Sequence, residues 1–277
     1  IVINMVTWKT AESLRDSEQH LTTGCKTLDS ALRGGIARRG ITQIYGAAGT
    51  GKTQYALQLC LSVQIPESEG GCGAAAVYIC TESIFPTRRL QQLLKSSELV
   101  KNYGASGDKI YVEHINKADR IRLRELLFPH LQSELERCLF ERIPRLMAVQ
   151  KIGLLVIDSI AAPYRVEYSD HELKNRAKSL RSIGQNLHNL CRNYELSTVC
   201  INQVSAAVDN KDSANACNGN LPTLGITWNS LITNSFCLVK SGDRRALHVR
   251  ESPYLPRKSV PFEIRQSGII GRAICDA

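Results

Sequence analysis

The sequence predicts an α/β protein with a mostly parallel, twisted sheet, helices on both faces and antiparallel strands at its C-terminal end. Short apolar, β-branched segments alternate with longer segments whose apolar residues recur at helical spacing, which is typical of βαβ units. A glycine-rich loop of the phosphate-binding type, residues 46–53, lies between the first strand and the first helix. After residue 234, strand-like segments follow one another without helices, which predicts antiparallel pairing there.

The first half of the chain contains predicted strands and helices in alternation. Residues 42–45 form the first strand, and residues 52–63 form a helix because their apolar side chains recur three and four positions apart. Residues 74–80 are an apolar second strand. Residues 86–94 form a helix with proline in its first turn, where that residue is favoured. Residues 110–114 form the third strand.

The second half continues the alternation and then ends in strands. We expect a long helix over residues 119–142, kinked or split by Pro129, because proline removes a backbone donor. Residues 154–157 and 197–201 are apolar strands on either side of another helix. A polar loop is expected over residues 205–220. The final predicted strands are residues 235–240, 245–249 and 260–265.

The helix between the fourth and fifth strands has two stripes of different character. Its apolar stripe, expected to be buried, consists of Leu173, Ala177, Leu180, Gly184, Leu187 and Cys191. The basic stripe beside it consists of Lys174, Lys178, Arg181, Gln185, His188 and Arg192. A basic stripe is more often a solvated face than a nucleic-acid contact, so solvation is the interpretation that we favour.

Size and composition favour one large domain. The chain has 277 residues, 43% of them apolar. We expect residues 1–20 to be a linker or interaction arm and residues 21–277 to be the core. The chain begins at Ile1 without an initiating methionine, so we expect the natural protein to start earlier, with room for an N-terminal domain.

Charge and cysteine usage narrow the partners and the compartment. No apolar run approaches the roughly 20 residues that a membrane span needs, so no membrane partner is expected. The ten cysteines include no C-x-x-C pair, and several lie inside apolar segments, which favours the nucleus or the cytosol. The formal net charge of +9 favours a polyanionic partner, although many basic proteins bind none.

The glycine-rich loop matches the phosphate-binding sequence G-x-x-x-x-G-K-T at every fixed position. It consists of Gly46, Ala47, Ala48, Gly49, Thr50, Gly51, Lys52 and Thr53. Glycines let the backbone approach a phosphate and turn its N–H groups inward. Lys52 is expected to reach the β- and γ-phosphates, and Thr53 to ligate Mg²⁺ through its hydroxyl. The sequence therefore predicts a site for ATP and Mg²⁺.

Three polar residues follow predicted strands at the edge where a sheet of this type binds ligands. Asp158 follows the fourth strand and is expected to hold Mg²⁺ through water, the alternative being an ordinary cap of a turn or helix. Glu82 follows the second strand and is a candidate general base for an attacking water. Gln203 follows the fifth strand, and its amide is a candidate sensor of the γ-phosphate.

Several segments resemble the RecA-type recombinases of eukaryotes and archaea. Those segments are residues 21–25, 28–29, 32–36, 46–53, 78–82 and 200–204. Residues 54–60, 161–165 and 224–228 are similar to the recombinase paralogues in particular. The resemblance covers residues 5–277 and implies a RecA-like P-loop ATPase core.

The resemblance implies roles at the nucleotide. Glu82 is expected as the catalytic base, Gln203 as the γ-phosphate sensor, and Arg89 near the adenine. The segment 251–256 resembles the cap that one subunit places over its neighbour's ATP. The cap residues singled out on this ground are Glu251, Pro253 and Pro256.

The resemblance also implies two DNA-binding loops. Tyr164 and Arg165 fall in the first loop, where Arg165 can pair with a phosphate and Tyr164 can stack on a base or simply pack. The second loop spans residues 204–220. Its one cation is Lys211, and it has no aromatic residue on which bases would stack.

The sequence departs from the recombinases at the contacts between subunits. Ser230 stands where the strand-exchange enzymes have a histidine that senses ATP across the interface. Their Phe-x-x-Ala hook aligns with residues 5–8, which places Met5 at the phenylalanine and the much bulkier Trp8 at the alanine. These departures weigh against autonomous filaments and strand exchange, and leave ATP binding intact.

Two functions remain open. The first, which we favour, is a mediator subunit that works in the nucleus in homologous recombination. It would pair with another recombinase paralogue and support the recombinase filament on single-stranded or branched DNA, with weak ATP hydrolysis. The alternative is an autonomous DNA-dependent ATPase that forms filaments and exchanges strands. A P-loop kinase or a hexameric helicase is a third, less favoured reading, because the cap-like segment 251–256 fits neither.

Overall fold

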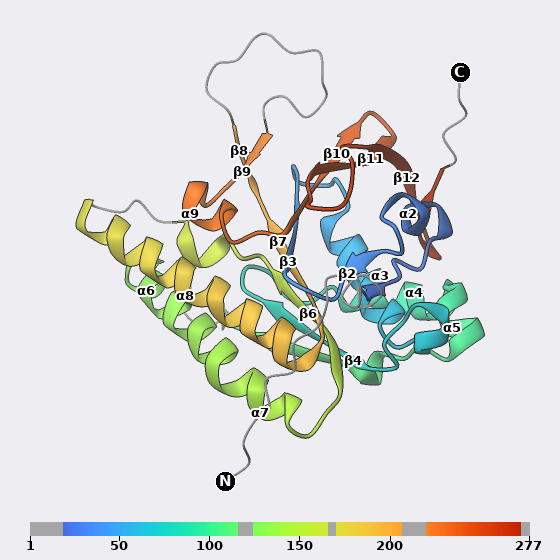
Figure 1. Ribbon diagram of the computed structural model, residues 1–277, viewed down its shortest axis with the longest axis horizontal. Coiled ribbons are helices and arrows are strands. Elements are labelled where there is room, and N and C mark those ends of the chain that lie inside the picture. Colours follow the sequence, from blue (N-terminus) through green and yellow to red (C-terminus); the bar gives the residue numbers. More distant parts are fainter. Residues whose placement is uncertain (1–18, 116–123, 166–169, 207–219, 273–277) are drawn as a thin grey trace, which may run out of the picture.

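A computed structural model describes residues 19–115, 124–165, 170–206 and 220–272. Its centre is a nine-stranded sheet with helices on both faces (Figure 1). The predicted fold class is therefore confirmed. Met5, Trp8 and Lys211 lie outside the described residues, as does almost all of the predicted arm. No helix among the described residues is long and apolar enough to cross a membrane.

Five neighbouring strands of the sheet run parallel and carry the site. In spatial order they are β3 (Ile41–Tyr45), β7 (Ser197–Asn202), β6 (Ile152–Asp158), β4 (Ala75–Cys80) and β5 (Ile110–His114). All five were predicted within a few residues of these bounds, because each is a short apolar run. A parallel sheet is covered on both faces, and its strands are accordingly almost continuously buried.

The sheet continues beyond β3 into the C-terminal strands. β10 (Asn234–Ser241) pairs parallel to β3, and β11 (Arg244–Glu251) and β12 (Ser259–Arg265) follow antiparallel. The edge strand β13 (Gly268–Gly271) was not predicted, because four residues are too few to show a strand pattern. Two short ribbons complete the described strands. They are β1 (His20–Leu21) with β2 (Ile36–Ala37), and β8 (Val204–Ala206) with β9 (Asn220–Pro222).

Successive side chains of each strand point to opposite faces of the sheet, and each face has its own apolar core. On β4, Ala76 and Tyr78 face one core, whereas Val77 and Ile79 face the other. The first core is covered by α2 (Lys26–Ala31), α3 (Lys52–Ser62), α4 (Thr87–Ser96) and α5 (Glu98–Tyr103). The second is covered by α6 (Arg124–Arg137), α7 (Ile143–Met147), α8 (Asp170–Tyr194) and α9 (Gly225–Asn229). Figure 1 shows α6, α7 and α8 together on one side of the sheet, with α3, α4 and α5 on the other.

Three expectations about local structure were wrong. Of the two effects expected of Pro129, a kink or a split, the split is wrong, since α6 continues through this residue and the interruption is the π-helical turn Cys138–Arg142. Leu173 is 45% exposed, because burial in α8 begins only near Leu180. The ends of the predicted loop 205–220 are not irregular, because they pair as the ribbon β8–β9.

Candidate functional site

The candidate site lies at the carboxyl ends of the parallel strands. The phosphate loop begins directly after β3, and Asp158 is the last residue of β6. Glu82 follows β4 and Gln203 follows β7, the strand between β3 and β6. The four neighbouring strands therefore bring the predicted nucleotide residues to one edge of the sheet, as expected for this topology.

Two glycines allow the phosphate loop to adopt its path. Gly46 has φ 152°, and a Cβ there would lie 2.2 Å from the carbonyl oxygen of Leu238. Gly51 has φ 113°, and its Cβ would lie 2.8 Å from Cδ1 of Ile264. The loop is thus pressed against β10 and β12. Backbone atoms leave no space for a Cβ at Gly46, and the positive φ favours glycine at both positions.

Lys52 crosses the loop and is positioned for an anion. Its Nζ donates to the carbonyl oxygens of Gly46 at 2.7 Å and Ala47 at 2.9 Å. An ammonium has three donors, so the third N–H has no partner among the described residues. Burial lowers the pKa of Lys52, and the carboxylates of Asp158 and Glu82 oppose that shift. Lys52 also begins α3, an 11-residue helix whose positive end adds to the attraction.

Asp158 is held by two hydroxyls at one oxygen. Its Oδ2 accepts from Thr53 Oγ1 at 3.0 Å and from the Tyr78 hydroxyl at 2.5 Å. Burial raises the pKa of Asp158, and these two hydrogen bonds counteract part of the shift. Sequence reasoning missed Tyr78. The signal for it was the strand alternation, because Tyr78 points to the same side of the sheet as Asp158.

The nucleotide base has a candidate pocket beside the phosphate loop. The pocket has a volume of about 540 Å³, within the range of ligand sites, and it is lined by Gly49, Gly51, Lys52, Thr53, Gln54, Arg89, Arg245 and Ile264. Nε of Arg89 donates to Gln54 Oε1 at 2.5 Å, and Nη2 donates to the Arg265 carbonyl at 2.6 Å. Burial lowers the pKa of Arg89. These bonds hold the guanidinium plane in place along the pocket wall.

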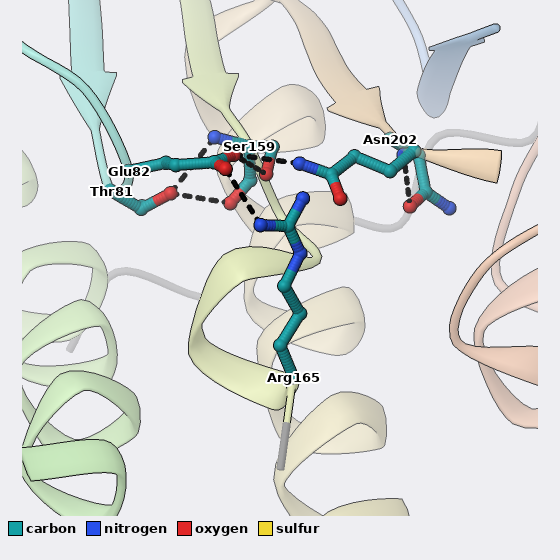
Figure 2. Close-up of polar contacts among 6 residues, drawn as sticks. Thr81, Glu82, Ser159, Arg165 and Asn202 are labelled. Atoms are coloured by element: carbon teal, nitrogen blue, oxygen red, sulfur yellow. Dashed lines mark hydrogen bonds and ion pairs between the residues drawn. The ribbon is translucent and has the colours of Figure 1, made fainter. Parts of the chain in front are cut away.

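Two of the predicted functional residues form hydrogen bonds with the carboxylate of Glu82. Arg165 Nη1 lies 2.6 Å from Glu82 Oε1, and Gln203 Nε2 donates to Glu82 Oε2 at 2.7 Å. Figure 2 shows the extended Arg165 side chain reaching toward Glu82. A longer contact of 3.5 Å joins Ser159 Oγ to Oε2. The candidate base, the candidate sensor and the candidate DNA residue therefore form one cluster.

The strand ends beneath this cluster are bonded to one another. Thr81 Oγ1 donates to the Ser159 carbonyl at 2.6 Å, and the Ser159 N–H donates back to Thr81 Oγ1 at 2.8 Å (Figure 2). Asn202 Oδ1 accepts from the Gln203 N–H at 2.7 Å, and Asn202 Nδ2 donates to Gln43 Oε1 at 2.7 Å. Sequence reasoning gave these residues no role. Their hydrogen bonds fix the backbone at the strand ends from which Glu82 and Gln203 project.

The two candidate residues of the first DNA-binding loop differ in exposure. Tyr164 is 4% exposed, and its hydroxyl lies 2.8 Å from Ser179 Oγ, so of the two alternatives the structure has packing and not stacking. The Arg165 side chain is 43% exposed and its charge faces solvent as well as Glu82. Lys211 of the second loop lies outside the described residues.

The cap-like segment lies away from this chain's own phosphate loop. Glu251 is the last residue of β11 and pairs with Ser235 near the amino end of β10, whereas the phosphate loop leaves the carboxyl end of β3, which runs parallel to β10. Glu251, Pro253 and Pro256 are exposed. Ser230, at the position where a histidine was expected, directly follows α9 and is also exposed, with its hydroxyl donating to the Thr227 carbonyl at 3.0 Å.

Comparison with known proteins places this geometry in a family. The family model named Rad51 matches residues 14–272. The DNA repair protein XRCC3 of Bos taurus is 37% identical over 274 residues, covering 92% of this chain and 76% of the relative. The DNA repair protein XRCC3 of Mus musculus is 34% identical, covering 94% and 77%. The DNA repair protein rhp57 of Schizosaccharomyces pombe is 32% identical, covering 91% and 79%. Membership of this family implies nucleotide binding, and the chain belongs to the Rad51 family.

Proposed function

We propose that the chain is an ATP-regulated mediator subunit in homologous recombination. It would join another Rad51-family paralogue, work in the nucleus, and support the recombinase filament on single-stranded DNA during double-strand break repair. The observation that carries the proposal is an intact phosphate site joined to a base that is already engaged by Arg165 and Gln203. Relatives at 32–37% identity are named DNA repair proteins, which supports the same role.

The phosphate loop and its neighbours fit a nucleotide triphosphate. When bound, ATP supplies a γ-phosphate whose presence or loss the chain can register. Lys52 has one N–H to offer that phosphate, and the glycine path leaves room for it. Arg89 would flank the adenine with the plane that Gln54 holds. Gln203 would exchange its bond with Glu82 for one with the γ-phosphate.

Thr53 and Asp158 fit a Mg²⁺ ion. Because Thr53 Oγ1 donates its proton to Asp158, its lone pairs remain for the ion. Asp158 would hold the ion through water. No cluster of three His, Cys, Asp or Glu residues exists among the described residues, which suits an ion that shares its ligands with phosphates and waters.

Hydrolysis would be slow in this arrangement. A general base must present a carboxylate oxygen to the attacking water. Arg165 engages Oε1 of Glu82 and would compete with the attacking water for the carboxylate even after Gln203 has left Oε2 for the γ-phosphate. The nucleotide would therefore act chiefly as a switch at an interface, and the exposed cap-like segment at the opposite edge of the sheet would cover a neighbour's site.

An autonomous strand-exchange ATPase is the second candidate. It is favoured by one observation, the presence of Glu82 and Gln203 beside the phosphate loop. Two others weigh against it. Tyr164 is buried, so it offers no surface for stacking on bases, and Ser230 offers only a hydroxyl at the position of the expected sensor.

The test is nucleotide binding and hydrolysis with and without a paralogue partner. Lys52→Ala should abolish binding. Lys151→Ala is the matched control, because Lys151 is an exposed lysine whose 2.9 Å ion pair with Glu67 lies outside the site. Wild-type binding with little turnover, and a partner affinity that depends on nucleotide, would support the mediator. Brisk hydrolysis driven by DNA alone, with filaments and joint molecules, would favour the autonomous motor instead.

A further inference from the structure

We propose that Arg165 is a latch that couples nucleic-acid binding to the nucleotide site. In the latched state its guanidinium holds the Glu82 carboxylate, and a nucleic-acid phosphate that takes the guanidinium releases Glu82. Arg165 is thus a positioning residue for the base as well as a contact for the polyanion. The inference rests on the function proposed above and specifies how the site is regulated.

The geometry of Glu82 carries the first step. Oε1 lies 2.6 Å from Nη1 of Arg165, and Oε2 accepts from Gln203 at 2.7 Å (Figure 2). Arg165 directly precedes residues 166–169, and Gln203 directly precedes β8. The two segments expected to contact DNA therefore both begin at side chains that hold the same carboxylate.

The second step is that this ion pair can be exchanged. The side chains of Arg165 and Glu82 are 43% and 40% exposed, so water and ions reach both. Exposed ion pairs contribute a factor of at most about five to an equilibrium. Arg binds a phosphate with two parallel charge-assisted hydrogen bonds, which is enough to compete with such a pair. The charge of Glu82 acts to raise the pKa of Lys52, so Lys52 remains as a nearby positive charge for Glu82 when Arg165 leaves.

The third step is that the coupling is reciprocal. If binding of a polyanion must break the pair, then removing the charge of Glu82 must strengthen that binding by the same factor. General repulsion between Glu82 and a polyanion predicts strengthening too. The two explanations differ in one respect, because only the latch requires Arg165 to be present.

The test is a double-mutant cycle on binding of the full chain to a fluorescent oligothymidylate, read by anisotropy. Glu82→Gln should tighten binding by about two- to fivefold. Arg165→Gln should weaken binding and reduce its salt dependence. In the Arg165→Gln background, Glu82→Gln should change nothing. Equal tightening in both backgrounds, no tightening, or no binding by the wild type would each overturn the latch.

A second measurement separates the latch from the proposed function. Arg165→Gln should raise ATP hydrolysis in the absence of DNA and abolish its response to oligothymidylate. Arg145→Gln is the matched control, because exposed Arg145 lies on α7, which leads into the amino end of β6 at the opposite edge of the sheet. If the wild-type chain bound neither ATP nor a paralogue partner, the mediator function would be contradicted, but the double-mutant cycle on oligothymidylate binding could still be interpreted. An unchanged rate in Arg165→Gln would contradict the latch alone.

Discussion

The Tyr78 hydroxyl donates a 2.5 Å hydrogen bond to Asp158 Oδ2, although the two residues are 80 positions apart in the sequence. The same oxygen accepts from Thr53 at 3.0 Å. One carboxylate oxygen therefore joins β4, β6 and the first turn of α3. Partners that orient a carboxylate in this way tune its affinity for a metal ion, even though they do not touch the ion.

Replacing Tyr78 with phenylalanine should weaken Mg²⁺-dependent nucleotide binding by roughly tenfold, because the carboxylate loses one of the two donors that orient it. Calorimetry with a non-hydrolysable ATP analogue measures the change. Tyr55→Phe is the matched control. The Tyr55 hydroxyl is buried in the same core without a hydrogen-bond partner among the described residues, so its removal should leave binding unchanged. Equal loss in both variants would contradict a specific role for Tyr78.

Asp158→Asn should stabilise the chain in the absence of nucleotide, by about 0.5–2 kcal/mol at neutral pH. Burial raises the pKa of Asp158 in the fold, so the native state holds a proton more readily than the unfolded chain does. The wild type must therefore lose stability as the pH rises from the pKa of Asp158 in the unfolded chain to its higher pKa in the fold. The gain in the variant should disappear at low pH, where the native carboxyl is already neutral. Thermal unfolding of both proteins between pH 4 and 7 tests the sign, and a gain that is constant across this range would refute the assignment.

Much of the site follows from strand patterns. Apolar runs place Glu82, Asp158 and Gln203 at strand ends, and parallel strands bring those ends to one edge of the sheet. The glycine-rich loop has a fixed spacing of glycine, lysine and threonine, so its conformation can be predicted from the sequence. In each case the information is local, within a few residues of the site.

The contacts that tune the site are not local and could not be predicted. Arg165 and Glu82 are 83 positions apart, and Trp228, whose indole N–H donates to Gln43 Oε1 at 3.0 Å, is 185 positions from that partner. No periodicity links such residues, because their contact depends on the order of strands in the sheet. The burial of Tyr164 was undecided for a related reason, since it depends on packing against α8.

Gly46→Ala should abolish nucleotide binding and destabilise the chain by about 3 kcal/mol or more. The added methyl would lie 2.2 Å from the carbonyl oxygen of Leu238. This oxygen belongs to the backbone of a sheet strand, so it cannot move aside as the end of a flexible side chain could. Gly49→Ala is the matched variant in the same loop. Its φ is 75°, but nothing lies within 4 Å of the added methyl, so only the roughly 1 kcal/mol cost of a left-handed alanine is expected. Chemical denaturation of both variants tests the contrast, which fails if the two costs are equal.

Asn202→Ala should destabilise the chain by about 2–4 kcal/mol and also weaken the response to nucleotide. The side chain accepts from the Gln203 N–H at 2.7 Å and from the Thr223 hydroxyl at 2.5 Å, and it donates to Gln43 and to the Thr223 carbonyl. Its removal leaves buried partners unsatisfied, which costs more than the bonds contribute.

The control for this last prediction is Asn193→Ala, an exposed position on α8 where a change within about 0.5 kcal/mol is expected. Urea denaturation measures the stability of both variants, and nucleotide-dependent partner binding measures the function. Because Asn202 fixes the backbone of Gln203, a stable Asn202→Ala protein with a full nucleotide response would show that Gln203 needs no such support. A loss of response beyond the loss of folded protein is the outcome that the geometry predicts.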